Sequence, residues 1–409
     1  MDYNIGPSPK DTTLNLYNEQ EYVTTPQWNV IGIINGTIPN EVVVVGNHRD
    51  AWIAGGAGDP NSGSAVLNEV IRSMGIALDA GWKPMRTIIF ASWDGEEYGL
   101  LGSTEWVEEY LPWLSAANIA YVNVDVGVRG TKLKVAAAPL LNQIIRDVTQ
   151  AVPSPNQTIP GQTVGDLWDG YIRNMGSGSD FTAFQDYAGV PSIDLGFDQE
   201  AGSPVYPYHS NYDSFHWMEK FGDPGFVYHR TMAQIIGLFT AELSESLVIP
   251  FAATEYADAL SRYLDDVFQK LGPSTEPVTE EEIISLRSRV TPGEPKGSED
   301  LLDHSLKNLQ SSIVILRVKA AELDELARWA NELLWTNIPW WNIITKIKLG
   351  RAVAKANTQF KAFERSFLYA PGLDGREWFK HVVFAPGLWT GYSGGKSTQS
   401  LDMTDVNRH

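Results

Sequence analysis

The first 250 residues alternate short apolar runs with stretches of helical periodicity. Apolar strands are predicted at residues 42–45, 87–92 and 119–124. Between them the pattern predicts a helix from residue 63 to about residue 80 and another that starts at Ser103. This alternation is typical of an α/β fold with a mostly parallel mixed sheet and helices on both faces.

After Pro250 the pattern becomes helical throughout. The periodic segments are residues 255–271, 280–289, 299–335 and 343–369, with loops predicted at 272–277 and 291–296. We therefore expect two domains, an α/β domain at residues 1–249 and an all-helical domain at residues 250–409.

Polar side chains follow each of the three predicted strands. They are His48, Asp50 and Asp59 after the first strand, Glu96 and Glu97 after the second, and Asp125 after the third. The carboxyl ends of parallel strands meet at one edge of a sheet, where open α/β folds place their ligand sites. Imidazole and carboxylate are the usual zinc ligands besides thiolate, so the pattern favours a metal site.

A pair of zinc ions needs a bridging carboxylate, further ligands on each ion and a separate general base. Asp59 precedes Pro60, and such a bond allows the cis geometry that turns a side chain inward toward a bridge. Asp50 lies two residues after His48, where we expect its carboxylate to accept the second N–H of the imidazole and fix the tautomer. His209, in a loop rich in Tyr and Pro, completes the set.

Composition narrows the classes of partner and ligand. The formal net charge of −19, from 31 basic and 50 acidic residues, argues against a nucleic-acid partner, and we expect none. With no cysteine, any zinc must be held by His, Asp and Glu. No apolar stretch approaches the length of a membrane span, so we expect a soluble chain. Sequons at Asn35 and Asn156 would permit glycosylation.

Five motifs resemble those of the dinuclear zinc exopeptidases of the glutamate carboxypeptidase II and transferrin receptor group. They are H-R-D-A-W, D-P-N-S-G, F-A-S-W-D-G-E-E-Y-G-L-L-G, G-S-G-S-D-F and Y-H-S-N-Y-D. The resemblance extends from about Tyr3 to Gly394 and so covers most of the chain. It implies hydrolysis of a terminal peptide bond by a hydroxide that bridges two zinc ions.

The resemblance also implies a role for each ligand. His48 and Asp125 would hold one zinc, and Asp59 would bridge to the other. The second zinc would be held by Glu97 and His209. Glu96 would be the general base that takes a proton from the water and gives it to the leaving amine.

Further residues are implied at the substrate cleft. Tyr208 would stabilise the oxyanion of the tetrahedral intermediate, and Tyr392 would bind the terminal carboxylate of the substrate. Gly178 and Ser179 lie in a segment that borders the cleft in this family.

Several positions depart from the glutamate-selective members of the group. Asp194 and Gly196 stand where the resemblance implies arginines, Gly391 where it implies a lysine, and Ser179 where it implies an asparagine. We therefore expect a carboxypeptidase-like enzyme without strict glutamate selectivity. Phe197 and Trp389 are candidates for an apolar pocket.

Members of the group are membrane-anchored, with the catalytic domain in the extracellular space or vacuolar lumen, and form homodimers through the helical domain. This chain is expected to lack the anchor, the opening part of the protease domain and the apical domain. The alternative is a receptor-like or inactive truncated homologue that acts through protein interaction, because transferrin receptors share this fold without the ligands. Taken singly, a Glu pair is usually a solvated helix start, and an Asp before Pro is a common turn.

Overall fold

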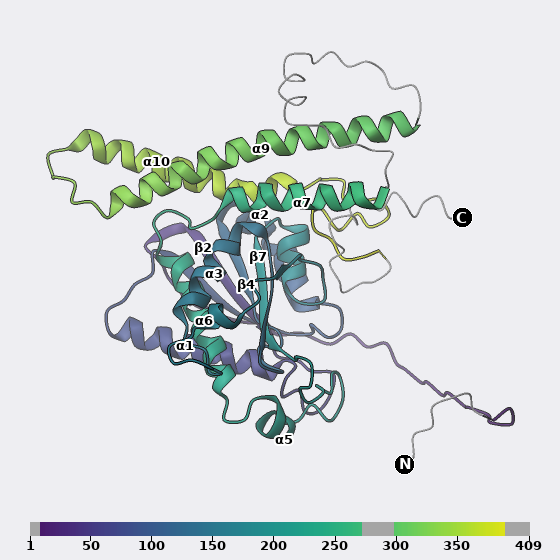
Figure 1. Ribbon diagram of the computed structural model, residues 1–409. Helices are drawn as coiled ribbons and strands as arrows, with labels where there is room; N and C mark the ends of the chain where they lie inside the picture. Colours follow the sequence, from purple (N-terminus) through teal and green to yellow (C-terminus); the bar gives the residue numbers. More distant parts are fainter. Residues whose placement is uncertain (1–8, 272–297, 389–409) are drawn as a thin grey trace.

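A mixed β-sheet organises the first part of the computed structural model, which describes residues 9–271 and 298–388 (Figure 1). In the described part the sheet has seven strands in the order β1-β3-β2-β4-β7-β5-β6. The strands are β1 (Val30–Ile34), β2 (Ile38–His48), β3 (Arg86–Trp93), β4 (Asn118–Asn123), β5 (Lys132–Ala137), β6 (Ile172–Arg173) and β7 (Ser192–Asp198).

The centre of the sheet is parallel and buried. Strand β2 pairs in parallel with β3 and β4, and β4 pairs in parallel with β7, whereas β1 and β5 run antiparallel to their neighbours β3 and β7. Residues Val42 to Val45 are at most 2% exposed, which is why this strand reads as an unbroken apolar run. The predicted mixed, mostly parallel sheet is confirmed.

Helices cover both faces of this sheet. The step from β2 to β3 through α1 and the step from β3 to β4 through α2 cross the sheet in opposite directions. Because such crossovers are right-handed, the two helices lie on opposite faces. Helix α6 packs beside α1 and contacts β2, β3 and β4. The helices of this part are α1 (Asn61–Asp79), α2 (Leu101–Ala117), α3 (Asn142–Ala151), α4 (Val164–Leu167), α5 (Phe215–Trp217) and α6 (Val227–Glu245), with single turns at Pro139–Leu141, Ala183–Tyr187 and Met218–Gly222.

The C-terminal part is helical, as predicted. Helices α7 (Ala253–Leu271) and α10 (Ile343–Phe363) both pack against the long α9 (Ser298–Leu334). Where α9 ends and α10 begins, the pair extends beyond the α/β body (Figure 1). The helix expected at 343–369 ends at Phe363 and continues as a 3-10 turn, Glu364–Phe367. The predicted helix at 280–289 and the loops at 272–277 and 291–296 lie outside the described residues. Among the helices of the described part, none combines the length and apolar character that crossing a bilayer requires.

The two parts share a buried junction. The carboxylate of Glu364, which is 0% exposed, accepts hydrogen bonds from Gln185 Nε2 at 2.7 Å, from the Tyr256 hydroxyl at 2.9 Å and from His381 Nε2 at 2.9 Å. One apolar core cluster continues from the sheet into α9 and α10. Because the two parts share this junction and one core, the structure does not test the division into two domains at residue 249. That division stays a proposal from the sequence.

Candidate metal centre

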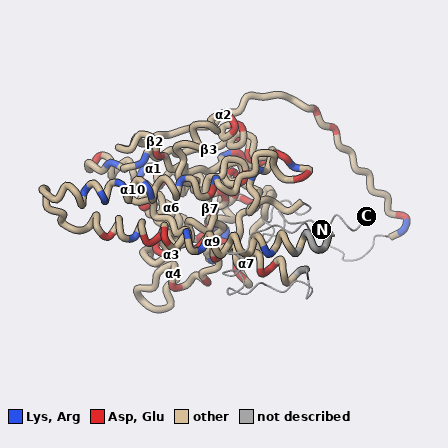
Figure 2. The backbone as a smooth tube through the Cα atoms, turned by 90° about the horizontal axis from the view of Figure 1, so that it is seen from above, with Lys and Arg blue, Asp and Glu red and all other residues tan. Residues whose placement is uncertain are grey.

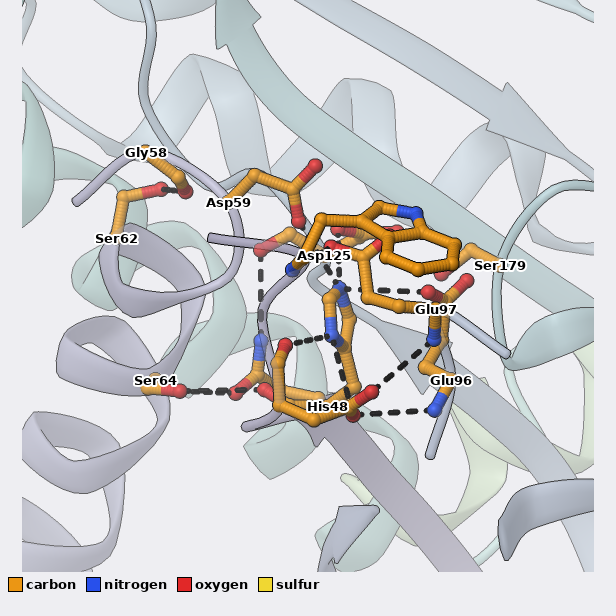
Figure 3. A network of polar contacts seen from close by, with 12 residues as sticks. His48, Gly58, Asp59, Ser62, Ser64, Glu96, Glu97, Asp125 and Ser179 are labelled. Carbon is orange, nitrogen blue, oxygen red and sulfur yellow. Dashed lines mark hydrogen bonds and ion pairs between the residues drawn. The ribbon is translucent and has the colours of Figure 1, made fainter. Parts of the chain in front are cut away.

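The carboxyl ends of β2, β3 and β4 bring the candidate ligands together. His48 is the last residue of β2 and pairs with Trp93 of β3, while Gly46 pairs with Asn123 of β4. Asp125 follows β4 by two residues and Glu96 follows β3 by three. Figure 3 shows the side chains of His48, Asp59, Glu96, Glu97 and Asp125 converging on one region.

The candidate ligands form two groups of three. In the first, Nε2 of His48 lies 2.8 Å from Oδ1 of Asp125 and 4.0 Å from Oε2 of Glu96. In the second, Nε2 of His209 lies 3.1 Å from Oε2 of Glu97 and 3.3 Å from Oδ2 of Asp59. Each group offers one imidazole and two carboxylates from separate parts of the chain.

Asp59 lies between the two groups. Its Oδ2 faces His209, whereas its Oδ1 lies 3.3 Å from Nε2 of His48. Oδ1 is buried and has no hydrogen-bond partner. Ligand atoms about 2.0 to 2.1 Å from a tetrahedral zinc are about 3.3 Å from one another. The two 3.3 Å distances at Asp59 are therefore compatible with zinc ligation by its carboxylate.

The electrostatics of the cluster favour positive charge. Burial and the Asp125 carboxylate raise the pKa of Glu96 to about 10, and burial and Asp59 raise the pKa of Glu97 to about 7. Burial alone would lower the pKa of His48, but the carboxylates around it, Asp125 foremost, raise it instead. A metal cation would satisfy this concentration of carboxylates.

Asp50 differs in detail from the sequence expectation. Nδ1 of His48 lies 3.0 Å from the backbone carbonyl oxygen of Asp50 and 3.7 Å from its carboxylate. The carboxylate instead accepts the backbone N–H groups of Glu96 at 3.0 Å and Glu97 at 3.1 Å. The backbone carbonyl oxygen of Asp50 is thus closer to Nδ1 of His48 than the carboxylate is, because the carboxylate is turned toward two backbone donors.

Two supporting residues were missed. The buried Asp213 accepts the N–H groups of Gly58 at 2.7 Å and Asp59 at 3.0 Å, and also the hydroxyl of Tyr206 at 2.7 Å. It thereby fixes the loop that carries Asp59. Asp213 ends the motif Y-H-S-N-Y-D, so the sequence contained a signal for it. The backbone N–H of Trp52 donates to Oε1 of Glu97 at 3.2 Å, and no sequence signal pointed to this contact.

Three special features of the backbone lie next to the candidate ligands. The Asp59-Pro60 bond is cis, and His209 has a φ of 51°. Gly63 in the first turn of α1 lies so close to the end of β4 that a Cβ there would be 2.1 Å from the backbone oxygen of Asp125. The start of α1 and the Asp125 backbone thus meet at a position that only glycine fits.

Two cavities flank the candidate ligands. One, of about 690 Å³, reaches Asp59, Asp125 and Tyr208, and the other, of about 560 Å³, reaches Glu96 and Glu97. Gly178, which was expected at the cleft, lines both. A chain-like substrate could therefore occupy space on both sides of the cluster.

The remaining predicted cleft residues have different environments. The ring of Tyr208 stacks on that of His209 with 3.7 Å between centroids. Ser179 is 3% exposed, and its hydroxyl accepts a hydrogen bond from Asn123 at 2.9 Å. Phe197 borders the larger cavity but is 2% exposed and packs on Tyr228. Tyr392, Gly391 and Trp389 lie outside the described residues.

The larger cavity is bordered by basic as well as acidic side chains. Asp194 and Gly196 do border the larger cavity, but Arg129, Lys134 and Arg173 border it as well. Gly196 has no room for a side chain, because a Cβ there would be 2.3 Å from the backbone oxygen of Val126. Positive charge therefore reaches the cavity from positions other than 194 and 196. A sequence comparison restricted to those two positions does not detect it.

Comparison with known proteins agrees with this geometry. Residues 29–221 match Peptidase family M28, and residues 304–396 match the transferrin receptor-like dimerisation domain. The chain combines an M28 peptidase domain with a transferrin receptor-like dimerisation domain. All six residues of the two ligand groups lie within the M28 match.

Three relatives illustrate the breadth of the family. A probable glutamate carboxypeptidase of Arthroderma benhamiae is 39% identical over 99% of this chain and 51% of its own length. The corresponding values for probable glutamate carboxypeptidase LAMP1 of Arabidopsis thaliana are 37%, 98% and 52%, and for aminopeptidase NAALADL1 of Mus musculus they are 32%, 93% and 48%. The chain thus spans about half the length of these curated relatives. A zinc aminopeptidase of Bacillus subtilis aligns with a TM-score of 0.43 at 22% identity over 53% of this chain and 50% of its own.

Proposed function

We propose that this M28-family chain is a dinuclear zinc exopeptidase, carboxypeptidase-like but without strict selectivity for glutamate. The position of Asp59 is the observation that carries the proposal. One of its carboxylate oxygens faces His48 and the other faces His209, each at 3.3 Å. In the proposed assignment His48 and Asp125 would hold one ion, Glu97 and His209 would hold the other, and Asp59 would bridge them. When bound, zinc supplies polarisation of the scissile carbonyl, acidification of water and positive charge that offsets the carboxylates.

Glu96 is assigned as the general base. It is 8% exposed, and its backbone is held by Asp50 beside the ligands. Of the carboxylate atoms around His48, its Oε2 is the most distant, at 4.0 Å against 2.8 Å for Asp125 and 3.3 Å for Asp59. A carboxylate that is not committed to a metal is free to accept a proton from water and to pass it to the nitrogen of the leaving amine.

Tyrosines are assigned to the substrate. The hydroxyl of Tyr208 would donate to the oxyanion that forms at the scissile carbonyl, since the ring is 47% exposed at the larger cavity and stacks beside His209. Tyr392 would bind the terminal carboxylate of the peptide.

Broad side-chain selectivity is supported by the mixed charge of the larger cavity. Arg129 forms two hydrogen bonds to the carboxylate of Asp198, at 2.8 and 3.3 Å, which offsets its charge. Asp194 adds a carboxylate that Asn123 holds at 2.9 Å. With both signs of charge present, a single anionic side chain has no dedicated site.

Two smaller proposals concern the oligomeric state of the chain and its glycosylation. The dimerisation domain supports a homodimer through the helical part. Asn35 and Asn156 are both exposed, so both sequons are accessible for glycosylation.

A peptide assay tests the proposed reaction. The zinc-loaded chain is incubated with peptides that differ in their last residue, and with copies that are acetylated at the amino end or amidated at the carboxyl end. Mass spectrometry should show stepwise loss from the free carboxyl end of several peptides, unaffected by acetylation and prevented by amidation. Loss from the amino end would instead make the enzyme an aminopeptidase. The absence of hydrolysis by a zinc-loaded chain would favour the receptor-like alternative.

A further inference from the structure

The turn between α9 and α10 exposes an unusual set of large apolar side chains. We call residues 335–348 the hairpin tip. Trp335 is 86% exposed and Trp340 is 84% exposed, and further exposed side chains follow them at Trp341, Ile343, Ile344 and Ile347. Contiguous apolar exposure of this kind marks an interaction surface.

The isoleucines lie on the face of α10 that points away from the protein. At about 100° per residue, Ile343, Ile347 and Ile344 fall within one arc of about 100°. The buried residues of the helix, among them Leu349 and Val353, centre on the opposite side. The isoleucine arc therefore takes no part in the packing of α10 against the core.

Lysines border this arc on both sides. By the same helical spacing, Lys346 precedes the arc by about 60° and Lys348 follows it by about 40°. Both side chains are exposed. A lysine at the border of an apolar face can lay its alkyl chain along that face and keep its ammonium group at a charged surface.

The charge of the segment is opposite to that of the chain. Between Glu332 and Glu364 there is no acidic residue, while the segment contains five basic ones. They are Lys346, Lys348, Arg351, Lys355 and Lys361. Figure 2 shows blue positions along α10 and no red ones, in a chain whose net charge is −19.

We propose that the hairpin tip docks on the surface of a membrane that contains anionic lipid. Tryptophan is enriched at the boundary between water and lipid, and isoleucine inserts into the acyl region beneath it. The exposed Lys346 and Lys348 beside the isoleucine arc attract anionic headgroups. The cores of protein interfaces are depleted in lysine, which argues for lipid over a protein partner. The tip lies on the membrane and does not cross it.

The acidic body does not prevent this docking. The turns of α10 at residues 343–348, where every side chain except Thr345 is exposed, extend the helix by about 9 Å. The Debye length at physiological ionic strength is about 8 Å, so the charge of the body is screened at the membrane surface. Raising the salt concentration should weaken the attraction of the lysines and leave the apolar contribution.

Vesicle co-sedimentation of the full chain tests the proposal. The vesicles are phosphatidylcholine alone, or phosphatidylcholine with about one third phosphatidylserine. We expect binding to the anionic vesicles, weak binding to the neutral ones, and weakening at about 0.5 M salt. The double variants Trp340→Ser/Trp341→Ser and Lys346→Glu/Lys348→Glu should each lower the affinity for anionic vesicles by about tenfold or more.

Matched variants elsewhere serve as controls. Leu16→Ser/Tyr22→Ser removes two exposed apolar side chains from the extended N-terminal segment, and Arg317→Glu/Lys319→Glu reverses two exposed charges in the middle of α9. Both should bind vesicles like the wild type, and circular dichroism checks that every variant folds. The proposal is overturned if the wild type ignores anionic vesicles or if the tip variants bind as well as the controls. It is also overturned if vesicles are not bound and the wild type sediments as a dimer while the tryptophan variant sediments as a monomer. The tip would then be a contact between copies of the chain.

Discussion

The carboxylate of Asp50 accepts the backbone N–H of Glu96 at 3.0 Å. This contact joins the loop that leaves β2, just after His48, to the turn that leaves β3. The second oxygen of the Asp50 carboxylate accepts the backbone N–H of Glu97 in the same way. One side chain thus fixes the spacing between the first imidazole and both members of the glutamate pair.

Asp50→Ala should therefore lower peptidase activity by about 10- to 100-fold, because the Glu96 turn loses both of its anchors. Steady-state kinetics on a peptide substrate checks this. Asp79→Ala, an exposed position at the end of α1, is the control and should leave activity unchanged. Wild-type activity in the Asp50 variant would show that the turn holds its shape without this contact.

Glu96→Gln should lower kcat by about 10²- to 10⁴-fold while the zinc content stays the same. The amide keeps the size of the side chain but cannot take up the proton. Glu105→Gln on the exposed face of α2 is the matched control. Loss of zinc in the Glu96 variant would contradict the assignment and make Glu96 a third ligand of the first group, within 4.0 Å of His48.

Two glycines of α1 offer a comparison within one helix. A Cβ at Gly63 would meet the backbone oxygen of Asp125 at 2.1 Å, whereas a Cβ at Gly75 has nothing within 4 Å. Gly63→Ala should destabilise the fold by about 1–3 kcal/mol and weaken zinc binding, because it displaces Asp125. Gly75→Ala should stabilise it by about 0.5–1 kcal/mol, since alanine is the better helix former. Thermal unfolding measures both, and equal effects would refute the close approach.

The buried Asp186 makes stability depend on pH. Burial raises its pKa well above the ordinary value; Arg376 opposes this and Glu364 adds to it. Both carboxylate oxygens lack hydrogen-bond partners. The folded chain holds this proton more tightly than the unfolded chain, so the contribution to stability falls as the pH rises from about 4 toward the folded-state pKa.

Asp186→Asn removes that titration. Within that pH window, the free energy of unfolding of the variant minus that of the wild type should increase by up to about 1.4 kcal/mol for each pH unit. Denaturant titrations at several pH values measure the difference, and Asp147→Asn, at an exposed position of α3, controls for a general charge effect. A difference that does not change with pH would mean that Asp186 titrates normally.

The sequence predicted the parts that depend on local pattern. The run at residues 42–45 is apolar because the strand is buried on both faces, and its carboxyl end predicted where His48 would meet Asp125. What the sequence could not predict depends on contacts between distant backbones. The acceptor of the His48 N–H, the role of Asp213 in the Asp59 loop and the arrival of Arg129 at the larger cavity all arise from tertiary geometry.

Elemental analysis of zinc in protein purified without chelator tests the central claim most directly. The account predicts two zinc ions per chain in the wild type and a clear loss in His48→Ala and His209→Ala, with His216→Ala, at an exposed position, as the control. Zinc near zero in the folded wild-type chain, or an unchanged content in both ligand variants, would contradict the proposed dinuclear site.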